Sequence, residues 1–236
     1  MNILSLETSA KAVSCAVVSD GTPIASAWQQ TGLTHSRTLM PMVEAMLKNS
    51  DMALRDMDAV AVAAGPGSFT GLRIGIAAAK GLAWGAAMPC IAVSTLEAMA
   101  TPLSHLEGQL ILCAMDARRQ QIYNALFLAQ EGALTRLAED RAIALEELAA
   151  ELAEEARPIT IVGDGAALCH DFLSKAGISC HLGPVHLRAQ SAVGVGLAAW
   201  PLAQAGAFLT AQELAPVYLR LSQAERERLE KLRGQK

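Results

Sequence analysis

The chain has 236 residues, of which 52% are hydrophobic and 18% are charged, and its formal net charge at pH 7 is −4. Such a chain is too apolar for intrinsic disorder, and it is long enough to bury the core of one large domain or of two smaller lobes. The acidic balance is not that of a nucleic-acid-binding protein, so an RNA substrate would take most of its phosphate contacts from another molecule.

The cysteines and the N-terminal residues indicate the cellular compartment in which the protein is expected to fold. Five cysteines occur without a CxxC pair: Cys15, Cys90, Cys113, Cys169 and Cys180. Their odd number and the apolar stretches around several of them predict buried free thiols in a reducing cytoplasm. The first seven residues contain neither a basic segment nor a long apolar one, so no signal peptide is expected. Residues 74–93 are apolar, yet Lys80 and Pro89 predict a core helix and strand there instead of a membrane span.

The first half of the chain predicts three strands followed by alternating helices and strands. In chain order these are strands at 2–7, 13–18 and 23–29, a helix at 35–49, a strand at 59–64, a glycine-rich turn at 65–71, a helix at about 70–86, a strand at 89–93 and a helix at about 95–104. The run 59–64 is wholly apolar, which is typical of a buried parallel strand. Pro41 is tolerated only near a first turn, which allows the regular helix to begin later than residue 35.

The second half predicts the same order of elements. Strands are expected at 109–115, 120–128 and 134–139, then a helix at 145–156, a strand at 159–162, a helix at 165–176, a strand at 178–182 and a helix at 189–205. Both halves therefore have the order βββαβαβα, although no sequence repeat is visible. The charged residues 221–236 are expected to form a solvated tail.

This duplicated order predicts an α/β fold of two lobes, each a mixed sheet with flanking helices. We expect an N-terminal lobe at 1–105 and a smaller C-terminal lobe at 106–220, and the alternative in which the C-terminal helix returns to the first lobe stays open. Two RNase-H-like lobes of this kind in one chain are the arrangement of the actin-like (ASKHA) ATPase folds.

The stretch 65–75 (GPGSFTGLRIG) joins a predicted buried strand to a helix. Backbone amides at such a helix N-terminus can bind an anion. The stretch has neither the Lys-Ser/Thr of a Walker A loop nor the GxGxxG spacing of a dinucleotide-binding loop. The candidate residues of a phosphate or anion loop are Gly65, Gly67, Ser68, Thr70 and Arg73. The structural alternative is that the glycines serve a tight turn and close helix packing.

Each half places an acidic residue at the end of its first strand, Glu7 in one and Asp116 in the other. In actin-like folds the turns at these places face a phosphate or its metal. Glu7, Asp116 and the nearby Arg118 are therefore candidates for a vestigial site between the lobes. The alternative is that both carboxylates accept hydrogen bonds from backbone amides of their turns.

The helix at 70–86 carries small residues at every fourth position. Each glycine in a helix interior costs about 1 kcal/mol relative to alanine, a cost that the close approach of another helix would offset. Together with the helix at 35–49, it predicts an apolar partner-binding face formed by Leu39, Met42, Met46, Gly71, Ile74, Gly75, Ala78 and Leu82. If these residues are instead core, a charged residue at Met46 or Ala78 would abolish folding as well as pairing.

Five stretches carry a resemblance to a known family. They are residues 3–9 (ILSLETS), 35–37 with 39–41 (HSR, LMP), 65–73 (GPGSFTGLR), 115–119 (MDARR) and 216–220 (PVYLR). Together they resemble the TsaB (YeaZ) family over residues 1 to about 220, and the stretch 65–73 is the most specific of them.

The resemblance implies an actin-like fold and a non-catalytic role in making N6-threonylcarbamoyladenosine beside the anticodon of tRNA. It implies pairing with the paralogue TsaD, which transfers the threonylcarbamoyl group, and work with the ATPase TsaE. The helical face would pair with TsaD and would self-pair as a homodimer in its absence. No cofactor is expected in the isolated chain, although ATP or ADP is allowed at the interface of the complex. Contact with tRNA is expected mainly through the complex, and no contact with a membrane is expected.

The catalytic paralogue carries two metal-binding histidines in a His-Leu-Glu-x-His type of motif. Aligned on Leu96 and Glu97, this chain has Thr95 and Met99 at the two metal positions, and neither replaces an imidazole. No catalytic residue and no metal site are therefore expected.

Three other functions are weighed against this one. The histidines, at 35, 105, 170, 181 and 186, form no HExxH motif, which makes a glycoprotease-like peptidase the least expected function. An independent ATPase or phosphotransferase would be revealed by ATP turnover. A direct tRNA-binding module is disfavoured by the net charge.

Overall fold

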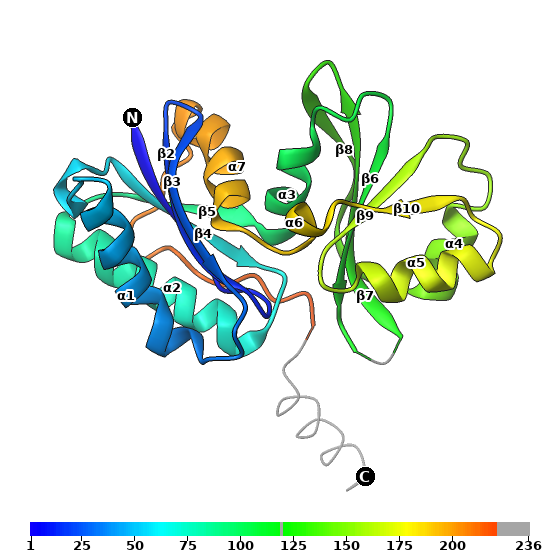
Figure 1. Ribbon diagram of the computed structural model, residues 1–236, viewed down its shortest axis with the longest axis horizontal. Coiled ribbons are helices and arrows are strands. Elements are labelled where there is room, and N and C mark those ends of the chain that lie inside the picture. The colour runs from blue at the N-terminus through cyan, green and yellow to red at the C-terminus, as the bar shows by residue number, and fades with distance from the viewer. Residues whose placement is uncertain (119, 221–236) are drawn as a thin grey trace, which may run out of the picture.

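The computed structural model describes residues 1–118 and 120–220 and shows two lobes side by side (Figure 1). Each lobe is built on a five-stranded sheet. The strand order is β3-β2-β1-β4-β5 in the first sheet and β10-β9-β6-β7-β8 in the second, which is the same order when each half is counted from its own first strand. The predicted element order and the two mixed sheets are confirmed.

The first half follows its prediction closely. Its elements are β1 (Asn2–Glu7), β2 (Val13–Ser19), β3 (Thr22–Gln29), α1 (His35–Asn49), a 3-10 turn (Leu54–Asp56), β4 (Ala59–Gly65), α2 (Phe69–Ala86), β5 (Cys90–Ser94), α3 (Thr95–Ala100) and a second 3-10 turn (Thr101–Leu103). Helix α1 begins at His35 with the exposed Pro41 inside it, so the later start that Pro41 allowed does not occur.

The second half differs from its prediction at three boundaries. Its elements are β6 (Leu110–Asp116), β7 (Gln121–Gln130), β8 (Ala133–Ala144), α4 (Leu145–Glu151), β9 (Ile159–Val162), α5 (Ala166–Lys175), β10 (Cys180–Leu182), α6 (Val185–Arg188) and α7 (Ala192–Gln204). Strand β8 is longer than expected, α4 is shorter, and the stretch expected as one helix is the short α6 followed by α7.

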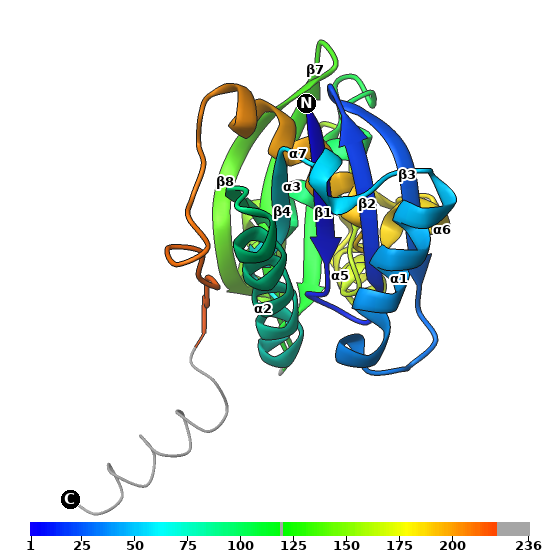
Figure 2. The same ribbon diagram turned by 90° about the vertical axis from the view of Figure 1, so that its left-hand side faces the viewer.

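The first sheet is covered on both faces (Figure 2). Because side chains alternate along a strand, Leu4 and Leu6 of β1 point to the core shared with α1 and α2, whereas Ile3 points to α7. The parallel pairing of β1 with β4 puts both of their carboxyl ends at the same edge of the sheet. The turns that follow these two strands therefore lie together.

The last helix of each half, α3 in the first and α7 in the second, packs on the other half's sheet. Leu96 and Met99 of α3 share a core with Ile111 and Cys113 of β6, and Val195 of α7 shares one with the first sheet. The alternative in which the C-terminal helix returns is therefore observed, and the prediction that 106–220 is all second lobe is wrong for α7 and the segment after it. The boundary near residue 105 stays a prediction, and the tail at 221–236 lies outside the described residues.

After α7 the chain runs back along the first lobe as an extended segment, residues 205–220, which we call the strap. Cys90 of the edge strand β5 and Leu209 exchange two backbone hydrogen bonds, at 2.8 and 2.9 Å. Further on, the Val217 amide donates to Ala64 O at 2.7 Å. The strap thus covers the start of β5 and reaches the carboxyl end of β4.

A charged network fastens α3 to the second sheet. Arg136 of β8 donates to Glu97 and to Asp140, both at 2.7 Å, and its guanidinium lies 4.6 Å from the centre of the Phe127 ring. The hydroxyl of Ser94, which caps α3, donates to Asp140. The network therefore joins the end of β5 in the first sheet to the second lobe.

Replacing Arg136 by methionine is expected to lower the free energy of unfolding by about 1–2 kcal/mol, because two charge-assisted hydrogen bonds are lost at a partly buried site. Urea unfolding followed by tryptophan fluorescence measures the change. Arg157→Met is the control, since it removes only the more exposed pair with Glu155, for which a loss under about 1 kcal/mol is expected. Equal losses in the two variants would contradict a role of the network in joining the lobes.

All five thiols are buried and free, as the sequence predicts. Among the described helices, none is long and apolar enough to cross a membrane.

Candidate functional site

The glycines of the 65–75 loop let the chain pack against the turn that follows β1. A Cβ atom at Gly67 would lie 2.6 Å from Ser9 O, and one at Gly71 would lie 2.1 Å from Thr8 O. Gly65 has a φ of +137°, and a Cβ there would lie 2.2 Å from Val217 O. Close approach of backbone to backbone explains these glycines, as in the structural alternative, and anion binding by the loop stays a prediction.

The polar residues of the same loop are also used internally. The Ser68 hydroxyl accepts a hydrogen bond from the Gly71 amide at 3.3 Å and so caps α2. The Ser68 amide donates to Ser9 O. Thr70 is exposed on the first turn of α2, and Arg73 lies on the next turn.

Glu7 and Asp116 are used in the same way in the two lobes. An oxygen of Glu7 accepts the amide of Ser9, and Oδ1 of Asp116 accepts the amide of Arg118 at 2.7 Å. Each carboxylate thus closes the turn after the first strand of its lobe, as the alternative to an inter-lobe site expects. Glu7 is fully buried, whereas Asp116 is exposed.

Burial makes Glu7 an unusual acid. Removal from water raises the pKa of Glu7 to about 7, against the opposing effect of the nearby Ser9 hydroxyl and of the hydrogen bond from the Ser9 amide. Its second oxygen, Oε2, has no hydrogen-bond partner among the described residues. When it is ionised, a carboxylate buried in this way lowers the stability of the folded state.

A polar cavity of about 480 Å³ lies between the lobes. Its walls come from the turns after β1 and β6, the start of α2, the loop after β9 and the strap, and they include Ser9, Lys11, Ser68, Asp116, Arg118, Asp164 and Arg220. The cavity brings together the predicted residues Ser68, Asp116 and Arg118. Asp164, which the sequence analysis missed, accepts from Gln190 Nε2 at 3.1 Å, and burial raises its pKa.

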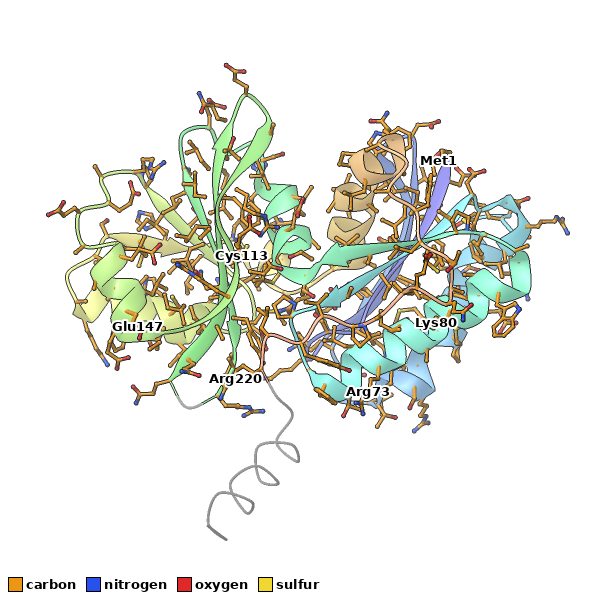
Figure 3. All side chains as sticks on the ribbon, turned by 180° about the vertical axis from the view of Figure 1, so that it is seen from behind. Met1, Arg73, Lys80, Cys113, Glu147 and Arg220 are labelled. Atoms are coloured by element: carbon orange, nitrogen blue, oxygen red, sulfur yellow. The ribbon has the colours of Figure 1, made fainter. Side chains whose placement is uncertain are left out.

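The strap forms one side of this cavity. Tyr218 stacks on Phe69 with ring centres 4.1 Å apart, and the Arg73 guanidinium lies 4.1 Å from the Phe69 ring centre. Arg73 Nε also donates to the Tyr218 hydroxyl at 3.1 Å, and Arg220 donates to Ala117 O at 2.5 Å. Figure 3 shows Arg220 at the lower edge between the lobes and Arg73 on the neighbouring helix.

The positions aligned with the paralogue's metal ligands lie on α3. Thr95 and Met99 are both buried, and Met99 packs in the core of the second lobe. Among residues 1–118 and 120–220, no three His, Cys, Asp or Glu side chains lie close enough together to hold a metal ion.

Half of the predicted partner-binding face is core. Leu39, Met46, Gly71 and Gly75 are buried in the isolated chain, where other parts of the chain cover them, so their contact with a partner stays a prediction. The remaining four are only partly buried and pack against the same core: Met42, Ile74, Ala78 and Leu82. A partner can reach these four only at their edges.

The outward side of α2 carries a different row of residues. Thr70, Arg73, Ala77, Gly81 and Trp84 are exposed and recur every three or four positions, which places them on one side of the helix. Trp84 is 85% exposed. We call this row the α2 stripe. The sequence analysis missed it, although the exposed tryptophan was a signal that could have found it.

Two mixed sheets of identical strand order, with a polar cavity between them, define an actin-like protein of two RNase-H-like lobes. The solved structure "YeaZ from Pseudomonas aeruginosa" matches with a TM-score of 0.80 and 27% identity, over 92% of this chain and 99% of that one. A family model described as TsaD, tRNA N6-adenosine threonylcarbamoyltransferase, matches residues 29–227.

Two curated relatives are named tRNA threonylcarbamoyladenosine biosynthesis protein TsaB. The Bacillus subtilis protein is 33% identical over 95% of this chain and 96% of its own length. The Escherichia coli protein is 34% identical over 93% of this chain and 95% of its own length. The chain belongs to the TsaB (YeaZ) family.

Proposed function

We propose that the protein is a non-catalytic subunit for the formation of N6-threonylcarbamoyladenosine in tRNA, pairing with TsaD and working with TsaE. The names of the curated relatives support a role in this modification. The similarity to the transferase family over residues 29–227 supports a paralogue as the catalytic partner. The five free thiols and the resemblance favour the cytoplasm as its compartment.

The observation that carries the pairing role is the environment of the glycines of α2. Gly71 and Gly75 are packed against Thr8, whereas a Cβ atom at Gly81 or Gly85 would meet no described atom within 4 Å. Each of these two glycines costs about 1 kcal/mol of helix stability that nothing described in the chain offsets. A helix of a partner lying close on the α2 stripe would offset that cost.

Trp84 gives the same surface an anchor. It lies beside an apolar groove of about 930 Å³ between the end of α2 and the strap, and Phe208 is partly exposed on the other side. Exposed tryptophans at the centre of an interface commonly carry much of the binding energy. The α2 stripe is therefore the surface assigned to TsaD, and to a second copy of this chain in a homodimer when TsaD is absent.

The catalytic step is assigned to TsaD because Thr95 and Met99 stand where the paralogue binds its metal, and both are buried in this chain. No nucleotide is assigned to the isolated chain, since the carboxylates and the loop around the cavity are engaged internally. ATP or ADP is assigned to the junction with TsaD.

A reconstitution tests the proposal as a whole. TsaD, TsaE, ATP, threonylcarbamoyl-adenylate and unmodified tRNA are combined with and without this chain, and the modified adenosine is quantified by nucleoside mass spectrometry. Modification that requires the chain, with none made by the chain alone, is the expected result. Modification in the absence of this chain would contradict the proposal. ATP turnover by the isolated chain would favour an independent ATPase.

Replacing Trp84 by alanine is expected to weaken pairing with TsaD by at least about 2 kcal/mol, roughly 30-fold in Kd, as truncation of an interface anchor does. Gly81→Lys is expected to abolish pairing, because a long charged side chain would hold the partner helix away. Titration calorimetry measures both affinities.

The matched control for pairing is Ala150→Lys, which adds the same charge to an exposed helical position of the other lobe. All three variants are expected to fold, which thermal unfolding checks. Unchanged affinity in Trp84→Ala and Gly81→Lys would move the pairing surface away from the α2 stripe.

A further inference from the structure

Four basic side chains from separate parts of the sequence meet at the mouth of the inter-lobe cavity. Lys11 follows β1, Arg118 follows β6, and Arg220 ends the strap, and all three line the cavity. Arg73 joins them through its hydrogen bond to Tyr218, which also lines the cavity. We call these four residues the basic rim.

The basic rim is unusual in this acidic chain. None of the ion pairs formed among the described residues includes Lys11, Arg73, Arg118 or Arg220. The whole chain has a net charge of −4, so a cluster of four basic side chains stands out on it. Three basic side chains and two carboxylates line the cavity, and Arg73 adds a fourth positive charge beside it, so this mouth carries an excess of positive charge that is expected to attract a polyanion.

The surface beside the rim has a second property that suits RNA. The stacked rings of Phe69 and Tyr218 line the cavity and both contact Arg73, and Tyr218 is 38% exposed. Arginines and exposed aromatic rings are the groups on which unpaired RNA bases stack while lysines and arginines hold the phosphates.

Two carboxylates limit how deep a polyanion could enter. Asp116 and Asp164 line the cavity itself, where they accept hydrogen bonds from Arg118 N and from Gln190. Their negative charge would repel a phosphate inside the cavity. A phosphate backbone would therefore lie across the rim and remain outside the cavity.

We infer that Lys11, Arg118 and Arg220 of the basic rim contact the sugar-phosphate backbone of the tRNA while the partner performs the transfer, with Arg73 at the border between the rim and the surface assigned to TsaD. The inference rests on the proposed function, which supplies tRNA as the polyanion present in the complex. It assigns to this chain a share of tRNA binding that its overall charge does not suggest. An acidic protein on the same surface is the competing occupant.

The test compares two variants of equal net charge in the complex of the full chain with TsaD. Lys11→Asn with Arg118→Asn removes two rim charges whose side chains make no described ion pair. Lys175→Asn with Arg55→Asn removes two exposed charges from other parts of the surface. Affinity for fluorescently labelled unmodified tRNA is measured by anisotropy at several salt concentrations, with TsaD alone as reference.

The rim variant is expected to bind tRNA about 25-fold more weakly at 0.1 M salt, or about 5-fold per lost phosphate contact, and its plot of log K against log salt is expected to be shallower by about 1.4. The control variant is expected to match the unmodified complex. Thermal unfolding shows that both variants fold.

Unchanged tRNA affinity in the rim variant, or an equal loss in both variants, would overturn the inference. Loss of TsaE binding with unchanged tRNA affinity would also overturn it and make the rim a protein interface. These results do not decide the proposed function. The reconstitution measures whether the modification requires this chain, whereas the anisotropy measures whether the basic rim contributes to tRNA binding.

Discussion

Replacing Glu7 by glutamine is expected to raise the free energy of unfolding by about 3 kcal/mol at pH 8 and to leave it nearly unchanged at pH 4. The physical reason is that Glu7 is fully buried, and burial raises its pKa from 4.5 to about 7. Glutamine has nearly the same shape and carries no charge at any pH.

The direction follows from proton binding in the two states. The folded chain keeps the Glu7 proton up to about pH 7, whereas the unfolded chain releases it near pH 4.5. Between these values the folded state binds more protons, so stability falls as the pH rises. Above about pH 7 Glu7 is ionised in both states, and the full loss of unfolding free energy caused by its burial is present. Below pH 4.5 Glu7 is protonated in both states, and this loss is absent.

Glutamine also suits the hydrogen bonds of the site. Its carbonyl oxygen can accept the Ser9 amide as Oε1 of Glu7 does, and its amide group would stand where Oε2 lacks a described partner. The Ser9 hydroxyl, also without a described partner, is an acceptor for that amide. The substitution therefore removes a buried charge without leaving a new polar group unsatisfied.

Urea unfolding between pH 4 and pH 8, followed by tryptophan fluorescence, measures the effect. Asp116→Asn is the matched control, because Asp116 accepts an amide in the equivalent turn of the other lobe but is exposed. Its expected change is below about 0.5 kcal/mol at every pH. A Glu7→Gln protein that is less stable at pH 8 would mean that the ionised carboxylate is compensated, for example by a bound cation.

The order of elements could be predicted because it depends on local patterns. The wholly apolar run 59–64 is a buried strand, and the glycine-rich stretch after it leads into a helix, as the sequence indicates. The same patterns repeated in the second half predict the two sheets. The end of α4 at Glu151 was missed because the helical pattern does not stop there: Leu152, the next residue, is apolar and buried like Leu145 and Leu148 within the helix.

The exchange of α3 and α7 between the lobes could not be predicted from periodicity. Both helices are apolar on most sides, since five of the six residues of α3 are buried and α7 is buried along most of its length. An apolar pattern shows that a helix is covered but does not show which sheet covers it. The strap was missed for a related reason, because it makes its contacts without forming a helix or a strand of its own.

The candidate site was half predicted. Glu7 and Asp116 lie where the sequence placed them, at the turn after the first strand of each half, and Ser68 lies between β4 and α2, because acidic residues, serines and glycines mark such turns. Asp164 and Tyr218 come from distant parts of the chain and reach the cavity only through the tertiary fold. Half of the predicted partner-binding face is buried in the isolated chain, because apolar periodicity marks residues that are covered without showing what covers them.

Alanine at Gly71 and alanine at Gly81 are expected to have opposite effects, although both positions are interior to α2. A Cβ atom at Gly71 would lie 2.1 Å from Thr8 O, so backbone must move, and we expect a loss of about 3 kcal/mol. At Gly81 no described atom lies within 4 Å, so alanine should add about 1 kcal/mol by its higher helix propensity.

For a chain of this length these changes correspond to a fall in Tm of about 6–12 °C for Gly71→Ala and a rise of about 2–4 °C for Gly81→Ala, which differential scanning calorimetry resolves. A rise in Tm for both variants would contradict the close contact between α2 and the turn after β1.

Gly81→Ala also distinguishes an effect on the stability of the isolated chain from an effect on pairing with TsaD. If a partner helix lies close on the α2 stripe, the variant will be more stable alone and yet bind TsaD more weakly, because the added methyl group occupies the space that the glycine leaves for that helix. The space that Gly81 leaves for the partner helix would then explain why this position holds a glycine that lowers the stability of the isolated subunit.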